Sequence, residues 1–167
     1  LGIILNVHLG WHYNNAHQYD LAIEQITKAL EFDPNFGLAY WYLGLAYEQE
    51  GRYGEAENAL RKANDLLKDN WALAADMAHL YAVSGRRDQA LKVIEELKGV
   101  SNRKYVSAYN IALIYVGLND VDQAFQWLEK AYRERSDLLI YLKVDARVDK
   151  IRTDPRFKDL LKRLDLP

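Results

Sequence analysis

The hydrophobic positions of the chain follow a helical rhythm that stops and restarts. One run at helical spacing contains Leu38, Leu43, Leu45, Ala46 and Tyr47. The stretch Gly51-Arg52-Tyr53-Gly54 interrupts it, and a second run then follows with Ala56, Ala59, Leu60 and Ala63 on one face. Glycine suits such a break because it tolerates the left-handed conformation found at helix ends. The pattern therefore predicts two helices joined by a short turn.

This two-helix pattern returns at a fixed interval of 34 residues. The tyrosines of the pattern are Tyr13, Tyr47, Tyr81 and Tyr115, and its alanines are Ala22, Ala56, Ala90 and Ala124. A row of small residues contains Gly10, Gly44, Ala78 and Ala112, and the turn recurs as Ala16-His17-Gln18, Gly51, Gly85 and Asn119. A period of about 20–50 residues is typical of repeat architectures. The chain is thus predicted to be an array of one helix hairpin.

The small residues of the repeat have a steric explanation. At Gly10 and Gly44 they leave room for a partner backbone where the two helices of a hairpin cross, with Ala22 and Ala56 meeting them from the second helix. The tyrosines are expected to fill the space between one hairpin and the next. Because a single hairpin cannot bury its apolar face, stability must come from stacking neighbours.

Composition and length limit the class of protein. The 167 residues are 50% hydrophobic and 28% charged, which is typical of one ordinary soluble domain. No apolar run approaches the roughly 18 residues of a membrane span, and cysteine is absent. The chain starts at Leu1 without an initiator methionine or the features of a signal peptide. We therefore expect a piece of a longer, cytoplasmic protein.

Charge is distributed unevenly along the chain. The net charge is −2, made up of −5 in residues 1–70, +1 in residues 71–135 and +2 in residues 136–167. No segment has the dense basic face that neutralising nucleic-acid phosphates requires. Direct binding of nucleic acid is therefore not expected.

The repeat resembles the tetratricopeptide repeat. The second unit carries the resemblance best, through Tyr40, Leu43-Gly44, Tyr47, Ala56, Leu60 and Ala63, and the first unit shares Leu9-Gly10, Tyr13, Ala22, Ala29 and Pro34. Units three and four depart mildly, with Met77-Ala78 and Ile111-Ala112 in place of Leu-Gly and no closing proline. The resemblance implies an all-α fold, a right-handed α-solenoid of four helix hairpins in residues 1–135, with units at about 3–36, 37–70, 71–104 and 105–135.

Residues 136–167 break the period, because Asp149 and Lys158 fall where a tyrosine and an alanine are required. A short amphipathic helix is predicted over 136–143, capped by Ser136 or Asp137. Asp154 followed by Pro155 predicts a second helix start, with Phe157, Leu160, Leu161 and Leu164 on one face. We interpret this tail as C-terminal capping helices, which repeat arrays need at an open apolar end.

The tail also resembles a segment that closes such arrays in large bacterial signalling proteins. The residues that carry this likeness are Tyr141-Leu142-Lys143-Val144-Asp145, Asp154-Pro155-Arg156-Phe157 and Leu160-Leu161-Lys162-Arg163-Leu164. In those proteins the array follows a DNA-binding, cyclase or kinase domain. The resemblance implies a bacterial regulator whose catalytic or DNA-binding domain lies outside this chain.

The sequence shows no catalytic constellation. His8 and His12 have metal-ligand spacing on a helix, but no Glu follows His8 and the nearest third candidate, His17, lies beyond the helix end. Glycine-rich phosphate loops and nucleophile elbows are also missing. We therefore expect no enzyme, no metal and no cofactor.

The resemblance implies that the first helix of each hairpin lines a concave groove. The candidate groove residues of the array are Val7, His8, Trp11, Asn14, Trp41, Tyr42, Leu45, Asp76, His79, Tyr109 and Asn110. Of these, Trp11, Tyr42, His79 and Tyr109 are expected to be partly accessible and to face one groove. A subfamily binds chaperone C-terminal carboxylates through a clamp of cations, but the matching positions here are Val7, Trp11, Tyr42, Ala72 and Asp76, so that ligand is not expected.

These observations support a non-catalytic protein–protein interaction module. Its partner is expected to be a peptide or protein segment held in an aromatic groove, because Trp and Tyr are enriched at binding hot spots. The alternative is a structural spacer that associates with itself inside a larger regulator.

Overall fold

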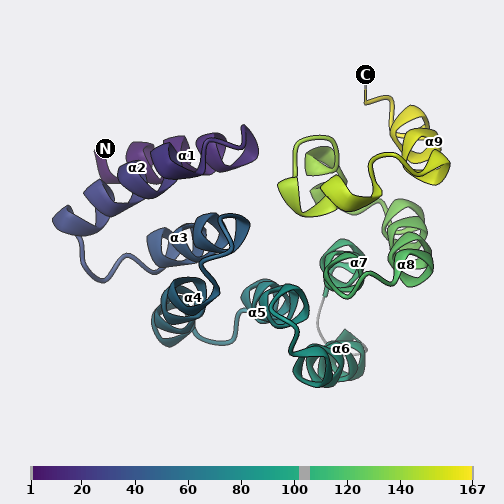
Figure 1. The fold of residues 1–167 in the computed structure, drawn as a ribbon, viewed down its shortest axis with the longest axis horizontal. Helices are drawn as coiled ribbons and strands as arrows, with labels where there is room; N and C mark the ends of the chain where they lie inside the picture. Colours follow the sequence, from purple (N-terminus) through teal and green to yellow (C-terminus); the bar gives the residue numbers. More distant parts are fainter. Residues whose placement is uncertain (1, 102–105, 167) are drawn as a thin grey trace.

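The computed structural model describes residues 2–101 and 106–166, which form a right-handed stack of helix pairs (Figure 1). The helices of the array are α1 (Gly2–Asn15), α2 (Tyr19–Phe32), α3 (Gly37–Gln49), α4 (Tyr53–Leu67), α5 (Trp71–Val83), α6 (Arg87–Ser101), α7 (Ala108–Gly117) and α8 (Val121–Arg133). Consecutive helices pair as predicted from the repeat, and the pairs follow an arc (Figure 1). The expected boundary between units three and four, at residues 104 and 105, lies outside the described residues.

The turns within the hairpins have the predicted backbone conformation. Gly51 and Gly85 adopt φ values of 74° and 82°, and His17 and Asn119, which stand at the same repeat position, adopt 59° and 58°. This left-handed conformation ends each first helix and starts the second after a very short connection. The turn prediction is confirmed at each of the four units.

The close crossing of the hairpin helices is also confirmed. A Cβ atom added at Gly44 would lie 2.6 Å from Cγ of Leu60 and 3.2 Å from the carbonyl oxygen of Ala56. At Gly10 it would collide with Ile26 and approach the carbonyl oxygen of Ala22 to 3.1 Å. The second helix therefore packs against the bare backbone of the first, as the row of small residues indicated.

The C-terminal segment, residues 136–166, forms two 3₁₀ helices and one α-helix. These are η1 (Asp137–Tyr141), η2 (Ala146–Ile151) and α9 (Pro155–Arg163). The predicted amphipathic helix over 136–143 is wrong in type, because Leu139 and Leu142 are both buried and a period of three places them on one side. The Ser136 hydroxyl caps no helix and instead lies 3.0 Å from the Ser107 hydroxyl. The start of α9 at Asp154 and Pro155 is confirmed.

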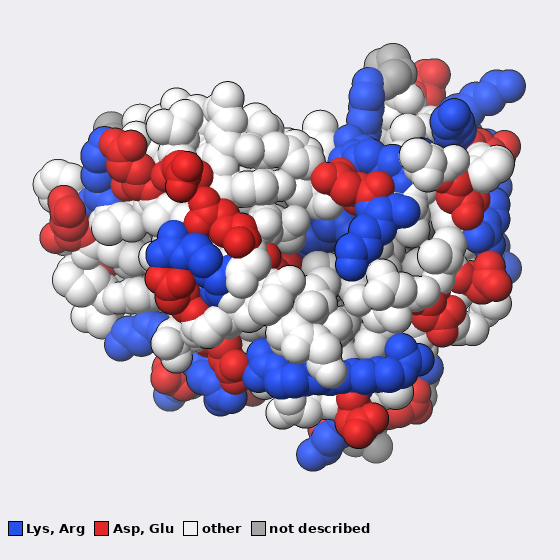
Figure 2. Space-filling view, in the orientation of Figure 1, with Lys and Arg blue, Asp and Glu red and all other residues white. Residues whose placement is uncertain are grey.

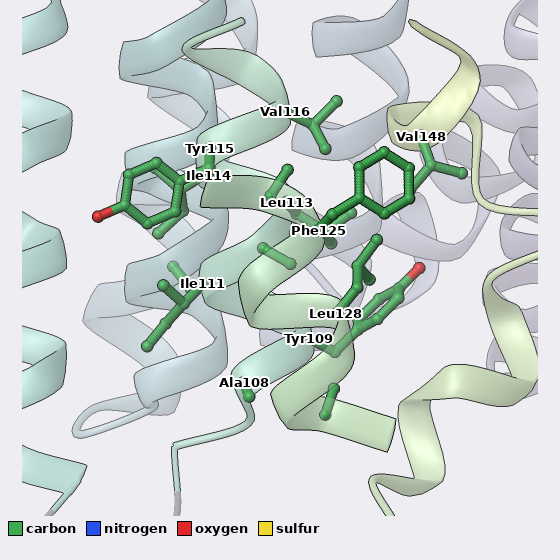
Figure 3. Packing of buried hydrophobic residues seen from close by; sticks show 14 of the residues in the cluster. Ala108, Tyr109, Ile111, Leu113, Ile114, Tyr115, Val116, Phe125, Leu128 and Val148 are labelled. Carbon is green, nitrogen blue, oxygen red and sulfur yellow. The ribbon is translucent and has the colours of Figure 1, made fainter. Parts of the chain in front are cut away.

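The segment shares its core with the last hairpin. Its buried side chains, which join one cluster with α7 and α8, are Leu139, Leu142, Val148, Ile151, Phe157 and Leu160. Figure 3 shows Val148 of η2 beside Phe125 of α8 and near Leu113 of α7. In Figure 1 the two 3₁₀ helices lie on the inner side of the arc, between α1 and α7. Within residues 2–101 and 106–166, each helix is too short or too polar to cross a bilayer.

Candidate functional site

The concave face carries an aromatic pocket between the first helices of the array and the C-terminal segment. It has a volume of about 240 Å³, and its lining residues are Trp11, Trp41, Tyr42, Leu45, Ala72, Asp76, Tyr109, Asn110, Leu138, Tyr141, Asp145 and Arg147. We call this cavity the aromatic pocket. It combines first helices of all four units with two turns of the C-terminal segment, so it exists only because the chain curves back on itself.

The ring contacts in the pocket hold its outer wall together. Trp11 of α1 stacks on Tyr42 of α3, with ring centroids 4.9 Å apart and an interplanar angle of 27°. Tyr141 of η1 meets Trp11 edge-on at 6.0 Å, and Trp41 lies 6.4 Å from Tyr42. These separations are in the range of favourable aromatic pairs. Trp11 and Tyr42 remain half-buried, whereas Tyr141 is exposed, so the rings present an apolar surface that a ligand can reach.

The floor of the pocket is a charged network centred on Arg147. Its Nη1 donates to Oδ1 of Asp76 at 2.6 Å, and its Nε and Nη2 donate to the two oxygens of Asp145 at 2.9 and 2.8 Å. The Trp41 indole nitrogen donates to Oδ2 of Asp76 at 2.7 Å, and the Tyr109 hydroxyl donates to Oδ2 of Asp145 at 3.0 Å. These five side chains, the Arg147 network, join α3, α5 and α7 to the C-terminal segment.

The two carboxyl groups of the Arg147 network have opposite pKa shifts. Burial raises the pKa of Asp76, and the charge of Arg147 and the hydrogen bond from Trp41 offset it only in part. Burial also raises the pKa of Asp145, but the charge of Arg147 and its hydrogen bonds outweigh this effect, so that pKa lies below its ordinary value. The difference follows the geometry, because Arg147 holds Asp145 with two hydrogen bonds and Asp76 with one.

The two ends of the chain differ in net charge. In Figure 2, a row of acidic side chains crosses the part formed by the first hairpins, with basic side chains beside it, and the C-terminal region carries basic and acidic side chains together. This agrees with the net charges of −5 and +2 counted for residues 1–70 and 136–167.

The structure gathers most of the expected groove residues. The candidates that line the aromatic pocket are Trp11, Trp41, Tyr42, Leu45, Asp76, Tyr109 and Asn110. Val7 instead lies in the core with Ile26 and Ala29, His8 is exposed outside the pocket, and Asn14 is buried.

The solvent accessibility expected for two of the groove residues is wrong. His79 and Tyr109 are only 3% and 2% exposed, although partial accessibility was expected for both. Tyr109 is buried because the C-terminal segment covers it, and its hydroxyl donates a hydrogen bond to Asp145 of that segment. His79 is buried by its neighbours, with Nδ1 2.8 Å from Oε1 of Glu48. A ligand lying across the concave face therefore cannot touch all four of the expected aromatic and histidine side chains.

The sequence interpretation missed four pocket residues, all in the C-terminal segment: Leu138, Tyr141, Asp145 and Arg147. The segment was interpreted only as a cap on the last hairpin. One signal was present, since Asp76 stands at a groove position where the other units carry His8, Tyr42 and Asn110. A buried carboxylate requires a partner, and the repeat itself supplies no cation for it.

No metal centre is visible in the described part of the chain, where His, Asp and Glu side chains do not gather in groups of three or more that could hold an ion. His8 and His12 are both exposed on α1. The pocket offers rings, one guanidinium and two carboxylates that are already paired with it. Its chemistry suits recognition of a side chain.

Known proteins share this architecture. Family models described as tetratricopeptide repeat match residues 9–70, 47–109 and 105–137. Superkiller protein 3 of Schizosaccharomyces pombe is 29% identical over 115 residues, covering 65% of this chain and 8% of that protein. A TPR repeat-containing protein of Methanocaldococcus jannaschii is 28% identical over 121 residues, covering 70% of this chain and 21% of that protein. The chain thus spans a small part of these relatives.

A solved structure agrees with the fold. The crystal structure of MamA superimposes with a TM-score of 0.55 at 24% sequence identity, covering 83% of this chain and 81% of that one. Together with the period, the turns and the close helix crossings, these matches define the architecture of a protein–protein interaction scaffold. The chain belongs to the tetratricopeptide repeat family.

Proposed function

We propose that this chain is a non-catalytic module that binds a peptide segment of a partner protein by one large apolar side chain. The observation that carries the proposal is the aromatic pocket, in which Trp11 and Tyr42 offer half-buried rings beside a cavity of about 240 Å³. Small-molecule sites usually measure about 300–1,000 Å³. A cavity just below that range suits a single side chain.

The position of the pocket also limits the ligand. The C-terminal segment fills the concave side at α7, since Leu142 and Val148 are buried in the same core as Leu113. A bound segment must therefore lie over the first two hairpins, where the acidic side chains run. Apolar anchoring at the rings would supply most of the affinity, because hot spots are concentrated at aromatic residues.

A peptide library displayed on phage tests this proposal without knowledge of the natural partner. We expect the selected peptides to share one large apolar residue, and a labelled peptide from the selection to lose at least tenfold in affinity for Trp11→Ala, since hot-spot truncations cost about 2 kcal/mol or more. Phe32→Ala is the matched control, because Phe32 is an aromatic residue, 74% exposed, that lies outside the pocket. Equal affinities of wild type and Trp11→Ala would refute the proposal.

Self-association is a second candidate function, favoured by exposed apolar side chains on the first hairpin. Ile4, Leu5 and Phe32 are 55%, 63% and 74% exposed there. The positions of Leu5 one and two repeats later, Ala39 and Leu73, are 0% and 1% exposed. Sedimentation of wild type, Leu5→Ser and Trp11→Ala separates the two functions. A self-associating spacer would lose association in Leu5→Ser and keep it in Trp11→Ala.

The parent protein is proposed to be a regulator. The support is the likeness of residues 141–145 and 154–164 to the closing segment of arrays in bacterial signalling proteins. Sequencing the whole gene tests this point, and a neighbouring domain without a sensory, catalytic or DNA-binding role would contradict it.

A further inference from the structure

A second cavity on the concave side is lined by Glu48, a buried residue with one carboxylate oxygen that has no hydrogen-bond partner among the described residues. This cavity has a volume of about 320 Å³, and its lining includes Glu48, Gln49, His79, Val83, Gly117 and Asp149. It is distinct from the aromatic pocket, and Arg147 alone lines both. We call it the helix-end cavity because α3, α5 and α7 all finish at it.

Glu48 is the unusual group in this cavity. Its side chain is 1% exposed, and its Oε1 interacts with two neighbours, Gln49 Nε2 at 3.0 Å and His79 Nδ1 at 2.8 Å. Its Oε2 is buried and has no hydrogen-bond partner among the described residues. Leaving a buried polar atom unpaired is costly, and more so for a charged group. A donor that enters the cavity would satisfy this oxygen, as a water molecule would.

The preceding repeat also has a buried polar side chain with an unpaired oxygen at this position. Asn14 stands 34 residues before Glu48, at the same position of the preceding first helix. It is 6% exposed, and its Oδ1 likewise has no partner in the described part of the chain. The equivalent positions in the other units are Ala82 and Val116, which carry no polar atoms. Among the described residues, the buried side-chain oxygens without a hydrogen-bond partner therefore lie on α1 and α3.

The charge around the cavity favours a cation as the missing donor. The guanidinium of Arg147 is already held by Asp76 and Asp145, and Lys150 is exposed and donates to Asn119 Oδ1 at 3.3 Å. Asp149 pairs with Arg152 at the exposed edge. The C-termini of α3, α5 and α7 add partial negative charge, equivalent to about half an electron each, and the N-termini of α2 and α4, whose first residues Tyr19 and Tyr53 also line the cavity, add partial positive charge. Among the described residues, no lysine or arginine forms an ion pair with the carboxylate of Glu48, whose printed side-chain partners are Gln49 and His79.

From this arrangement we propose that the helix-end cavity binds an alkyl chain ending in a cationic N–H donor, an ammonium or a guanidinium. The donor pairs with Oε2 of Glu48, and the alkyl chain lies against Val83 and Val116, which line the cavity. A lysine or arginine side chain and a free alkylamine share this chemistry. The site is separate from the aromatic pocket and does not depend on the proposed peptide anchor.

The test uses n-butylamine, butylguanidine and N-acetyl-lysine methylamide as probes, followed by NMR of the Gln49 side-chain amide and the His79 ring. We expect saturable shifts with the cationic probes and none with butanol or butyrate at equal concentration. Glu48→Gln keeps the volume but removes the charge, so affinity should fall at least about tenfold, the effect of losing one hydrogen bond to a charged group. Glu31→Gln, at an exposed position of α2, should bind as wild type.

Val83→Phe provides a second variant, because it fills the cavity without changing charge and remains informative if Glu48→Gln fails to fold. Binding of the lysine derivative would identify a peptide side chain, whereas binding of the free amines alone would identify a small metabolite-like cation. Butanol shifts equal to those of butylamine, unsaturable shifts, or unchanged affinity in both variants would overturn the proposal. Trp11→Ala should leave these titrations unchanged, so failure here is distinguishable from failure of the peptide proposal.

Discussion

The first two hairpins and the last two share one repeat but have different concave faces. At one repeat position, Trp41 of α3 is half-buried and lines an open pocket, whereas Tyr109 of α7 is 2% exposed beneath the C-terminal segment. At the next position, Tyr42 offers a ring, while Asp76 and Asn110 are buried polar groups. The same backbone scaffold therefore carries an open aromatic surface at one end and an interior at the other.

The difference shows that the C-terminal segment determines which part of the concave face stays open. Residues 136–151 occupy the concave side that repeats three and four would otherwise present. They are part of the core there, because Leu142 and Val148 are both 0% exposed. A segment buried to this extent stabilises the fold and also covers the concave side of α7.

The largest expected effect is on the buried charges that join the two regions. Arg147→Met removes the only cation of the network and leaves Asp76 and Asp145 buried, with side chains 9% and 5% exposed. Removing one partner of a buried ion pair typically costs about 3–5 kcal/mol in free energy of unfolding. Urea denaturation measures this loss directly.

Arg61→Met is the matched control in the first region. Arg61 is 62% exposed and pairs with Glu57 at 2.6 Å on the surface of α4. Exposed pairs contribute about 0–1 kcal/mol, so this variant should unfold nearly as wild type does. Equal losses in the two arginine variants would show that the C-terminal segment is not anchored by the Arg147 network.

A smaller effect is expected in the acid dependence of stability. The pKa of Asp145 is lowered in the folded state, so its contribution is present above the ordinary Asp value of about 3.9 and is lost as pH falls through the folded value. Asp76 acts in the opposite sense, because its folded pKa is raised. Its contribution is greatest at low pH and is lost as pH rises through the folded value.

The two asparagine variants should therefore change the pH profile in opposite directions. Between about pH 6 and 3, free energies of unfolding should fall less steeply with acid for Asp145→Asn than for wild type, and more steeply for Asp76→Asn. Urea titrations at several pH values provide the slopes. Slopes that shift in the same direction would contradict the assigned roles of the two carboxyl groups.

Much of the fold could be predicted from the sequence because the same residue types recur at the same position of several repeats. Gly44 and Gly51 alone would be ambiguous, but their recurrence as Gly10 and Gly85 fixes the crossing point and the turn. The C-terminal segment has no such repetition. Its 3₁₀ helices depend on long-range contacts such as Arg147 with Asp76, 71 residues apart in sequence, and local patterns carry no information about those.

The candidate site was predictable to the same limited degree. The register of the first helices correctly brought Trp11, Trp41 and Tyr42 to one place. It could not show that Tyr109 and His79 would be covered, because the covering groups lie outside the repeat or in its neighbours. Burial at a groove position depends on what else folds onto the groove.

Native-state hydrogen exchange tests most directly whether the C-terminal segment is a permanent part of the concave face. If it is, the amides of Leu142 and Val148 should be protected to nearly the same free energy as those of Leu113 and Ile114 in α7, because all four side chains belong to one buried cluster. Amides of residues 139–151 that exchange far faster than those of α7, with the array still folded, would contradict it. That result would mean that the segment detaches and that the groove of the last two hairpins is free to bind.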